Sequence, residues 1–107
     1  MRSALLPWGP WSQKQTLFNA FNDGGYGHFI HWPGHDNISD PFRYNEWGGP
    51  YGPYIVEKFT TGGNNRSTIY FTLSTWNPYT VVLMRAELEL KPTSNVTANF
   101  GNLPILI

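Results

Sequence analysis

Apolar and polar residues alternate along the second half of the chain, in runs that turn residues separate. The run Ser67–Ser74 carries Ile, Phe and Leu at positions 69, 71 and 73, with Tyr, Thr and Ser between them. The run Tyr79–Leu90 repeats the pattern, and its apolar face consists of Val82, Met84, Ala86, Leu88 and Leu90. Alternation with a period of two is typical of strands that bury one face and expose the other. With a further run before them, the stretch 48–90 predicts an antiparallel meander.

The reversals between these runs are marked by residues that favour turns. The first run, Tyr51–Phe59, is followed by Thr61-Gly62-Gly63-Asn64-Asn65, where Gly and Asn readily adopt a positive φ. The second reversal is Trp76-Asn77-Pro78, because proline fixes φ and biases the residue before it away from helical conformations. We expect a hairpin turn at each place, with Trp76 packed into its corner.

The rest of the chain is less regular. Gln13–Phe21 fits a strand or one or two helical turns, and we favour a strand. Tyr26–Trp32 predicts a short strand, and His35–Gly49 predicts a polar loop. Beyond the meander, we expect an edge strand within Asn95–Phe100 and a small apolar end at Leu103–Ile107.

Two segments share the pattern Tyr-Gly-x-aromatic-Ile. They are Tyr26-Gly27-His28-Phe29-Ile30 and Tyr51-Gly52-Pro53-Tyr54-Ile55. Two strand starts of the same design indicate a repeated sheet unit. Gly27 and Gly52 would let the backbone pass close to another strand or to a ligand.

Composition and charge narrow the class of protein. The chain has 107 residues and no cysteine, and its seven basic residues balance seven acidic ones. This length allows one small domain, and the scattered basic residues argue against nucleic-acid binding. The first residues lack the apolar core of a signal peptide, and no apolar run approaches a membrane span. No phosphate-binding glycine loop, nucleophilic triad or cysteine site is visible, so we expect no cofactor.

Three stretches carry a resemblance to a known family. GGYGHFIHWPG, EWGGPYGPYIVEKFTTG and STIYFTLSTWNPYTVVLMRAEL occur in this order over roughly residues 7 to 90. Together they resemble the C-terminal part of the domain-of-unknown-function 4185 (DUF4185) family. The resemblance implies a five-bladed β-propeller and an extracellular location. Some family members are similar to glycoside hydrolases that cut D-arabinan internally with carboxylates at a central cleft.

The resemblance implies only part of a propeller here. We expect an all-β fold of antiparallel meander sheets of propeller-blade type, about one and a half to two blades in all. Residues 7–47 would be the end of one blade and a connecting loop, 48–90 the last blade, and 91–107 a divergent tail. The catalytic acids of the family lie on early blades, so no catalytic residue is assigned and the isolated chain is expected to be inactive.

The acidic and histidine residues offer few other sites. Asp36, Asp40 and Glu46 share one loop and form the only acidic group that we consider for ligand contact. On a strand, His28 and His31 would point to opposite faces, because they are three positions apart. His31 with His35 or Asp36 is geometrically possible as a metal site, but the spacing matches no closed zinc pattern. We predict no metal.

Aromatic residues cluster at the predicted strand starts and corners. Aromatic rings stack on the apolar faces of sugars, and neighbouring polar groups bind the hydroxyls. The predicted carbohydrate-binding residues are His28, Glu46, Trp47, Tyr51 and Tyr54. Two alternatives stay open: a glycoside hydrolase that oligomerisation through exposed sheet edges completes, and a structural β protein that assembles without a ligand.

Overall fold

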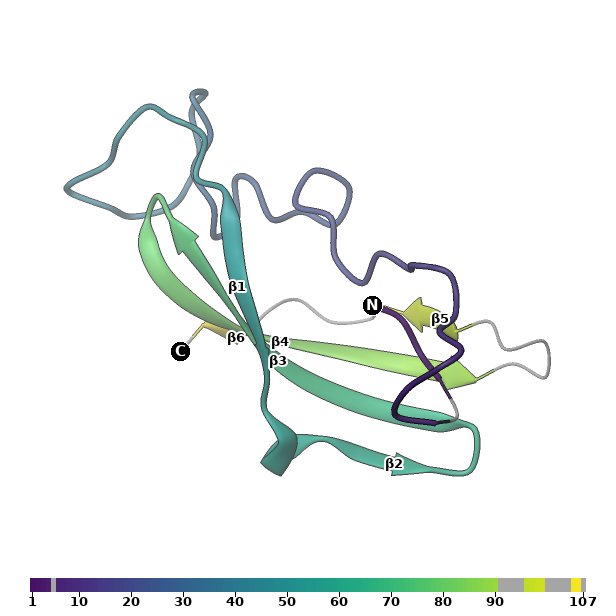
Figure 1. Cartoon of the computed structure of the whole chain (residues 1–107). Coiled ribbons are helices and arrows are strands. Elements are labelled where there is room, and N and C mark those ends of the chain that lie inside the picture. Colours follow the sequence, from purple (N-terminus) through teal and green to yellow (C-terminus); the bar gives the residue numbers. More distant parts are fainter. Residues whose placement is uncertain (5, 91–95, 100–104, 107) are drawn as a thin grey trace.

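The computed structural model is an all-β structure built on one antiparallel sheet (Figure 1), which confirms the predicted fold class. It describes residues 1–4, 6–90, 96–99 and 105–106. The elements are β1 (Pro50–Ile55), the 3-10 turn η1 (Glu57–Phe59), β2 (Thr61–Gly63), β3 (Arg66–Trp76), β4 (Tyr79–Leu90), β5 (Val96–Asn99) and β6 (Ile105–Leu106). The strand order is β1-β3-β4-β5, with β2 also paired to β3 and β6 to β4.

The β3–β4 hairpin is the centre of the sheet, and its register follows the alternation of the sequence. Ile69 lies opposite Ala86, and Phe71 lies opposite Met84. These residues and their neighbours Leu73, Val82 and Leu88 are buried, so one face of the hairpin forms the core. We call it the inner face. The predicted apolar face of β4 is confirmed as far as Leu88, and the side chain of Leu90 lies outside the described residues.

The strand that precedes the hairpin is shorter than predicted. β1 ends at Ile55, and η1 interrupts the run before β2 begins at Thr61. The sequence places Gly62 and Gly63 in the turn, but they pair with Ser67 and Arg66 as part of β2. The reversal itself is made by Asn64-Asn65, where Asn64 adopts a φ of 51°. Asparagine tolerates this left-handed conformation better than other non-glycine residues.

Neither strand predicted before residue 48 forms. Gln13–Phe21 has no regular structure until a turn begins at Ala20. In the Tyr26–Trp32 segment, the chain curls around the carbonyl of Gly25, which accepts hydrogen bonds from the N–H groups of residues 28, 29 and 30. Gly27 has a φ of 84° and donates to the carbonyl of Ile30 at 2.9 Å. The glycines therefore close a tight loop where alternation alone predicted an extended strand.

Residues 17–48, which we call the cover, pack against the inner face. Ala20, Phe29 and Ile30 are buried in the same core as the β3 and β4 side chains, and Leu17, Phe18 and Tyr26 pack at its margin. In Figure 1 this indigo to blue segment runs along one side of the sheet and reaches the tip of the β3–β4 hairpin. The inner face is thus closed by loops, and the predicted second sheet unit is not formed within the described residues.

Candidate functional site

A bulge in β1 brings two of the predicted binding residues together. Tyr51 lies opposite Ser74 and Tyr54 opposite Thr72, so three steps along β1 match two steps along β3. In a regular strand, residues three apart would point to opposite faces. The extra residue places Tyr51 and Tyr54 on the same face, away from the core. Gly52 allows this geometry with its φ of 58°.

Trp76 and Tyr79 extend this surface from the hairpin. They lie opposite each other at the end of the β3–β4 ladder, at alternate positions that point away from the inner face. Tyr54 is 73% exposed and Tyr79 85% exposed, while Tyr51 and Trp76 are nearly half exposed. We call Tyr51, Tyr54, Trp76 and Tyr79 the outer aromatic face. Trp76 is thus exposed, contrary to prediction, and Asn77 is the residue that packs in the corner.

Hydroxyl groups accompany these rings. Ser74 and Thr72 are the cross-strand partners of Tyr51 and Tyr54 and share their side of the sheet. A hydrogen bond with Tyr79, assisted by desolvation, raises the pKa of Tyr51 above its ordinary value. Tyr51 therefore stays a neutral phenol at neutral pH, able both to donate and to accept a hydrogen bond.

Trp47 belongs to a different group of rings, on the cover. Its ring centroid lies 4.8 Å from that of Tyr26, 5.5 Å from that of Phe21 and 6.3 Å from that of Trp32. Phe21 and Tyr26 are themselves 4.7 Å apart. These are contact distances between tilted rings, so the rings fill the space between them and leave no cage for a cation. Phe21, Trp32 and Trp47 remain exposed on their outer sides.

The two other predicted binding residues lie on loops. His28 is exposed in the tight loop after Gly25, and its ring lies close to Gly24. Glu46 is exposed, and its backbone carbonyl accepts a hydrogen bond from Asn77. Of the five predicted residues, the structure therefore brings together only Tyr51 and Tyr54 on one continuous strand surface.

The structural role of the two glycines in the repeated Tyr-Gly-x-aromatic-Ile pattern also differs from the prediction. Both Gly27 and Gly52 have a positive φ. A side chain at Gly52 would meet no atom within 4 Å, and one at Gly27 would only reach the Trp32 ring at 3.9 Å. The glycines are needed for backbone conformation, and neither allows a close approach of another strand.

A buried ionic cluster organises loop 31–48 of the cover. The His31 side chain is fully buried, with Nδ1 3.1 Å from Asp36 Oδ2 and Nε2 3.1 Å from Asp40 Oδ2. Arg43 Nη1 donates to Asp36 Oδ1 at 2.9 Å, and Nη2 donates to the carbonyls of Trp32 and Gly34. We call His31, Asp36, Asp40 and Arg43 the His31 cluster.

The carboxylate of Asp36 is the most buried acid of this cluster, with a side chain only 1% exposed. Desolvation raises its pKa, but hydrogen bonds from His31 and the N–H of Ile38 and the charges of His31 and Arg43 outweigh that effect. The net pKa of Asp36 lies below the ordinary value of 3.8, so it is ionised at neutral pH.

Asn77 joins this loop to the sheet. Its Nδ2 donates to the carbonyls of Tyr44 at 3.0 Å and Glu46 at 2.8 Å. Its backbone carbonyl accepts from the N–H of His31 at 2.9 Å, and the carbonyl of His31 accepts from Gly48. A side chain at Gly48 would lie 1.8 Å from the Asn77 carbonyl oxygen, so only glycine fits there.

These arrangements do not form a metal site. Within the ranges that the structure describes, no group of three or more His, Cys, Asp or Glu residues is arranged to hold a metal ion. Asp36 and Asp40 face opposite nitrogens of the His31 ring, so their oxygens do not converge with a ring nitrogen on one point.

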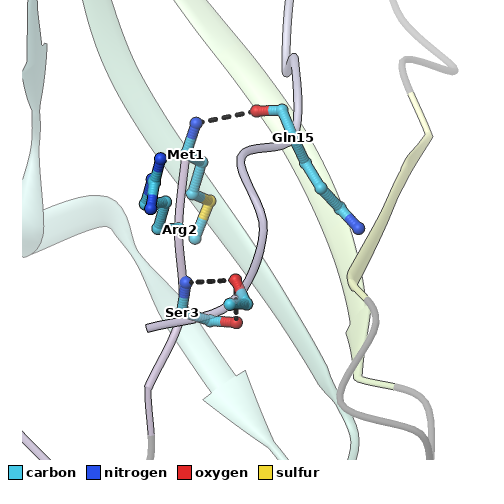
Figure 2. Close-up of a pocket in the computed structure, with 5 residues that line it drawn as sticks. Met1, Arg2, Ser3 and Gln15 are labelled. Atoms are coloured by element: carbon cyan, nitrogen blue, oxygen red, sulfur yellow. Dashed lines mark hydrogen bonds between the residues drawn. The ribbon is translucent and has the colours of Figure 1, made fainter. Parts of the chain in front are cut away.

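A surface hollow between Met1–Ser3 and Ser12–Gln15 offers no ligand site either (Figure 2). Two backbone hydrogen bonds join Met1 and Gln15, at 2.7 and 2.9 Å, and the amide and hydroxyl of Ser3 contact the Ser12 hydroxyl. The side chains and backbone leave no space for a water molecule. This hollow is a seam between two paired segments.

Sequence reasoning missed several of the residues that shape the site. The alternation that places residues 70, 72 and 74 outward also places Trp76 outward, and this signal was present in the sequence. No sequence pattern marks Arg43 or Asn77. Asn77 binds backbone carbonyls some thirty positions earlier in the chain, and Arg43 binds backbone carbonyls and Asp36, which the path of the loop brings to it.

Comparisons with known proteins do not assign this chain to a family. No protein-family model, curated protein or solved structure matches this chain. In the part of the chain that the structure describes, no helix is long and apolar enough to cross a membrane.

Proposed function

We propose that this chain is a carbohydrate-binding β module, related to the C-terminal part of the DUF4185 family, that does not hydrolyse glycans by itself. The outer aromatic face is the observation that carries the proposal, because its four rings are exposed on one face of the sheet beside hydroxyl side chains. A sugar ring presents an apolar C–H face to an aromatic ring and hydroxyl groups at its rim. The rings of the outer aromatic face can stack on the C–H face, and the neighbouring hydroxyl side chains can bind the sugar hydroxyls.

The positions of the motifs that resemble the DUF4185 family also support the outer aromatic face as the binding surface. The Tyr-Gly-Pro-Tyr-Ile motif is strand β1 with its bulge, and the Ser-Thr-Trp-Asn-Pro-Tyr motif is the tip of the β3–β4 hairpin. Two of the three stretches that carry the family resemblance therefore contain the segments that build the outer aromatic face. Glu46 and Trp47 lie on loop 31–48 of the cover and are not part of this surface.

The carboxylates argue against hydrolysis by the isolated chain. Glycoside hydrolysis needs two carboxyl groups about 5–10 Å apart across the sugar. Asp36 and Asp40 are engaged with His31, and Asp36 is almost fully buried. Glu46 is the exposed acid of that loop, and one exposed acid does not make a catalytic pair. Hydrolysis of arabinan by the wild type that is lost in Glu46→Gln would overturn this part of the proposal.

Calorimetric titration with soluble arabinan oligosaccharides tests the binding surface. Tyr54→Ala should raise Kd by about tenfold, because an aromatic contact of this size is worth roughly 1.4 kcal/mol. Tyr44→Ala is the matched control, since Tyr44 is also exposed but lies on loop 31–48. Equal affinity of the wild type and Tyr54→Ala would reject the outer aromatic face, and no heat from any neutral glycan would reject carbohydrate binding.

The second candidate function is assembly of several copies of the chain through the outer face of the sheet, which the cover leaves exposed. Val81, the cross-strand partner of Ser74, is exposed on the same face as the outer aromatic rings. The edge of β1 is a poor surface for strand addition because Pro50 and Pro53 have no N–H to donate. A concentration-dependent rise of mass in light scattering that Tyr54→Ala abolishes, without any glycan response, would favour assembly through the face of the sheet.

A further inference from the structure

The His31 cluster has a proton requirement that the binding proposal does not use. A neutral imidazole has one N–H donor and one nitrogen that only accepts. Both ring nitrogens of His31 lie 3.1 Å from carboxylate oxygens, which are acceptors when ionised. With both carboxylates ionised, the geometry is satisfied only when His31 carries a proton on each nitrogen. A single ring proton would leave a lone pair of the fully buried His31 ring facing a carboxylate.

The charges around the ring balance in this state. Asp36 also accepts hydrogen bonds from Arg43 and from the N–H of Ile38, and Asp40 accepts one from the N–H of Phe42. With a doubly protonated His31, two positive side chains face two carboxylates. From the hairpin, the backbone carbonyl of Asn77 accepts the N–H of His31, and this carbonyl does not titrate. Loss of one His31 proton would leave a net negative charge in a buried cluster, which is unfavourable.

The cluster also controls how the loop meets the sheet. His31 supplies the N–H that donates to Asn77 and the carbonyl that accepts from Gly48, at the two ends of loop 31–48. The same loop carries the carbonyls of Tyr44 and Glu46 that bind the Asn77 amide. By contrast, the β3–β4 ladder is held by backbone pairs that do not depend on His31. The loop and the sheet can therefore open separately.

We propose that docking of loop 31–48 on the tip of the β3–β4 hairpin requires both ring protons of His31, and that loss of one proton as pH rises releases the loop while the sheet stays folded. Release frees the ends of the loop, where Trp32 and Trp47 lie, so the aromatic contacts of the cover separate. The inference does not depend on carbohydrate binding.

Asp40→Asn provides a variant with an opposite expectation. The side-chain amide that this substitution introduces would donate to an unprotonated Nε2 of His31, while its oxygen keeps the contact with the N–H of Phe42. In this variant the loop should stay docked with a singly protonated ring. Glu57→Gln removes the same charge from an exposed position on η1 and is the matched control.

Amide hydrogen exchange, corrected for the intrinsic effect of pH, measures the release. In the wild type and Glu57→Gln, exchange at Gly48 should accelerate by about tenfold or more as pH rises, because a buried charged hydrogen bond is lost. Amides of the β3–β4 ladder should stay protected, and Asp40→Asn should show no acceleration. Acceleration in Asp40→Asn at the same pH as in the wild type would overturn the proposal, as would a wild type with no release before global unfolding.

A measurement on the wild type alone keeps the proposal testable if Asp40→Asn does not fold. Nitrogen NMR of the imidazole distinguishes a protonated from an unprotonated ring nitrogen. Both His31 nitrogens should be protonated under conditions in which Gly48 is protected from exchange. One unprotonated nitrogen in the docked state would overturn the proposal.

Discussion

The sheet and its cover are held together in different ways. In the β3–β4 hairpin, backbone pairs run without interruption from Arg66↔Glu89 to Trp76↔Tyr79. The cover meets the sheet through core side chains and through a few single contacts around His31 and Asn77. A ladder tolerates the loss of one side chain because its neighbours remain paired. A single contact has no such support, so we expect the cover to open first.

The largest effect should come from the inner face, where the two regions meet. Phe71→Ala should lower the free energy of unfolding by about 3–5 kcal/mol, because it leaves a cavity between the sheet and the cover. Tyr54→Ala removes a ring of similar size from the outer aromatic face and should change stability by no more than about 0.5 kcal/mol. Denaturant unfolding of both variants measures the contrast. Similar losses would mean that the outer aromatic face is also part of the stabilising core.

The second prediction concerns the charges of the cover. Asp36→Ala should cost about 3 kcal/mol or more, because it leaves His31 and Arg43 without their shared carboxylate. The lowered pKa of Asp36 also gives a pH dependence. The ionised carboxylate of Asp36 stabilises the folded state fully at pH values above 3.8, the ordinary pKa of an aspartate. This stabilisation is lost as the pH falls through the lower pKa that Asp36 has in the folded protein.

Unfolding curves measured from neutral pH to well below 3.8 check this expectation. Asp36→Asn should lose the part of the acid dependence that Asp36 causes. An acid dependence unchanged in Asp36→Asn would show that other carboxylates are responsible for it.

A third prediction tests the junction of loop and hairpin. Gly48→Ala should destabilise the protein by about 1–3 kcal/mol, since its methyl group would overlap the Asn77 carbonyl. Gly63→Ala is the control on the sheet, because a side chain there meets no atom within 4 Å. Hydrogen exchange should show that Gly48→Ala opens the cover and leaves the ladder protected. Equal effects of the two substitutions would remove the distinction between cover and sheet.

The smallest effect is expected at the bulge. Gly52→Ala should cost about 1–2 kcal/mol, because a φ of 58° strains alanine although the space around it is open. Gly52→Asn should cost less, since asparagine tolerates this conformation. Thermal unfolding measures both. If alanine costs nothing, the bulge does not depend on glycine, and the orientation of Tyr51 and Tyr54 must have another cause.

The two regions also differ in how far their sequence predicts them. Alternation in β3 and β4 predicts both strands, their turn and their buried face, because period two is a local property of an extended chain. The cover has no comparable period. The strand predicted at Tyr26–Trp32 is wrong because Gly25 and Gly27 curl the chain, and the sequence does not distinguish this from a strand with glycines.

The same limit applies to the candidate site. The sequence predicts Tyr51 and Tyr54 as binding residues, but the bulge that puts them on one face depends on the register with β3. It also allows His31 as a metal ligand with His35 or Asp36. Asp36 does lie beside His31, but Arg43 and Asp40 make the arrangement ionic, and those partners are brought in by the path of the loop.

The bulge of β1 has a consequence for changes in chain length. Deleting one residue from β3 would turn every following side chain to the opposite face and would expose the core. Deleting Gly52 or Pro53 would instead leave Tyr51 and Tyr54 two positions apart, which is the ordinary spacing for one face of a strand. Strand β1 can therefore absorb the loss of one residue without inverting its tyrosines. Among homologous sequences, we expect length variation at this point of the sheet and an invariant length in β3.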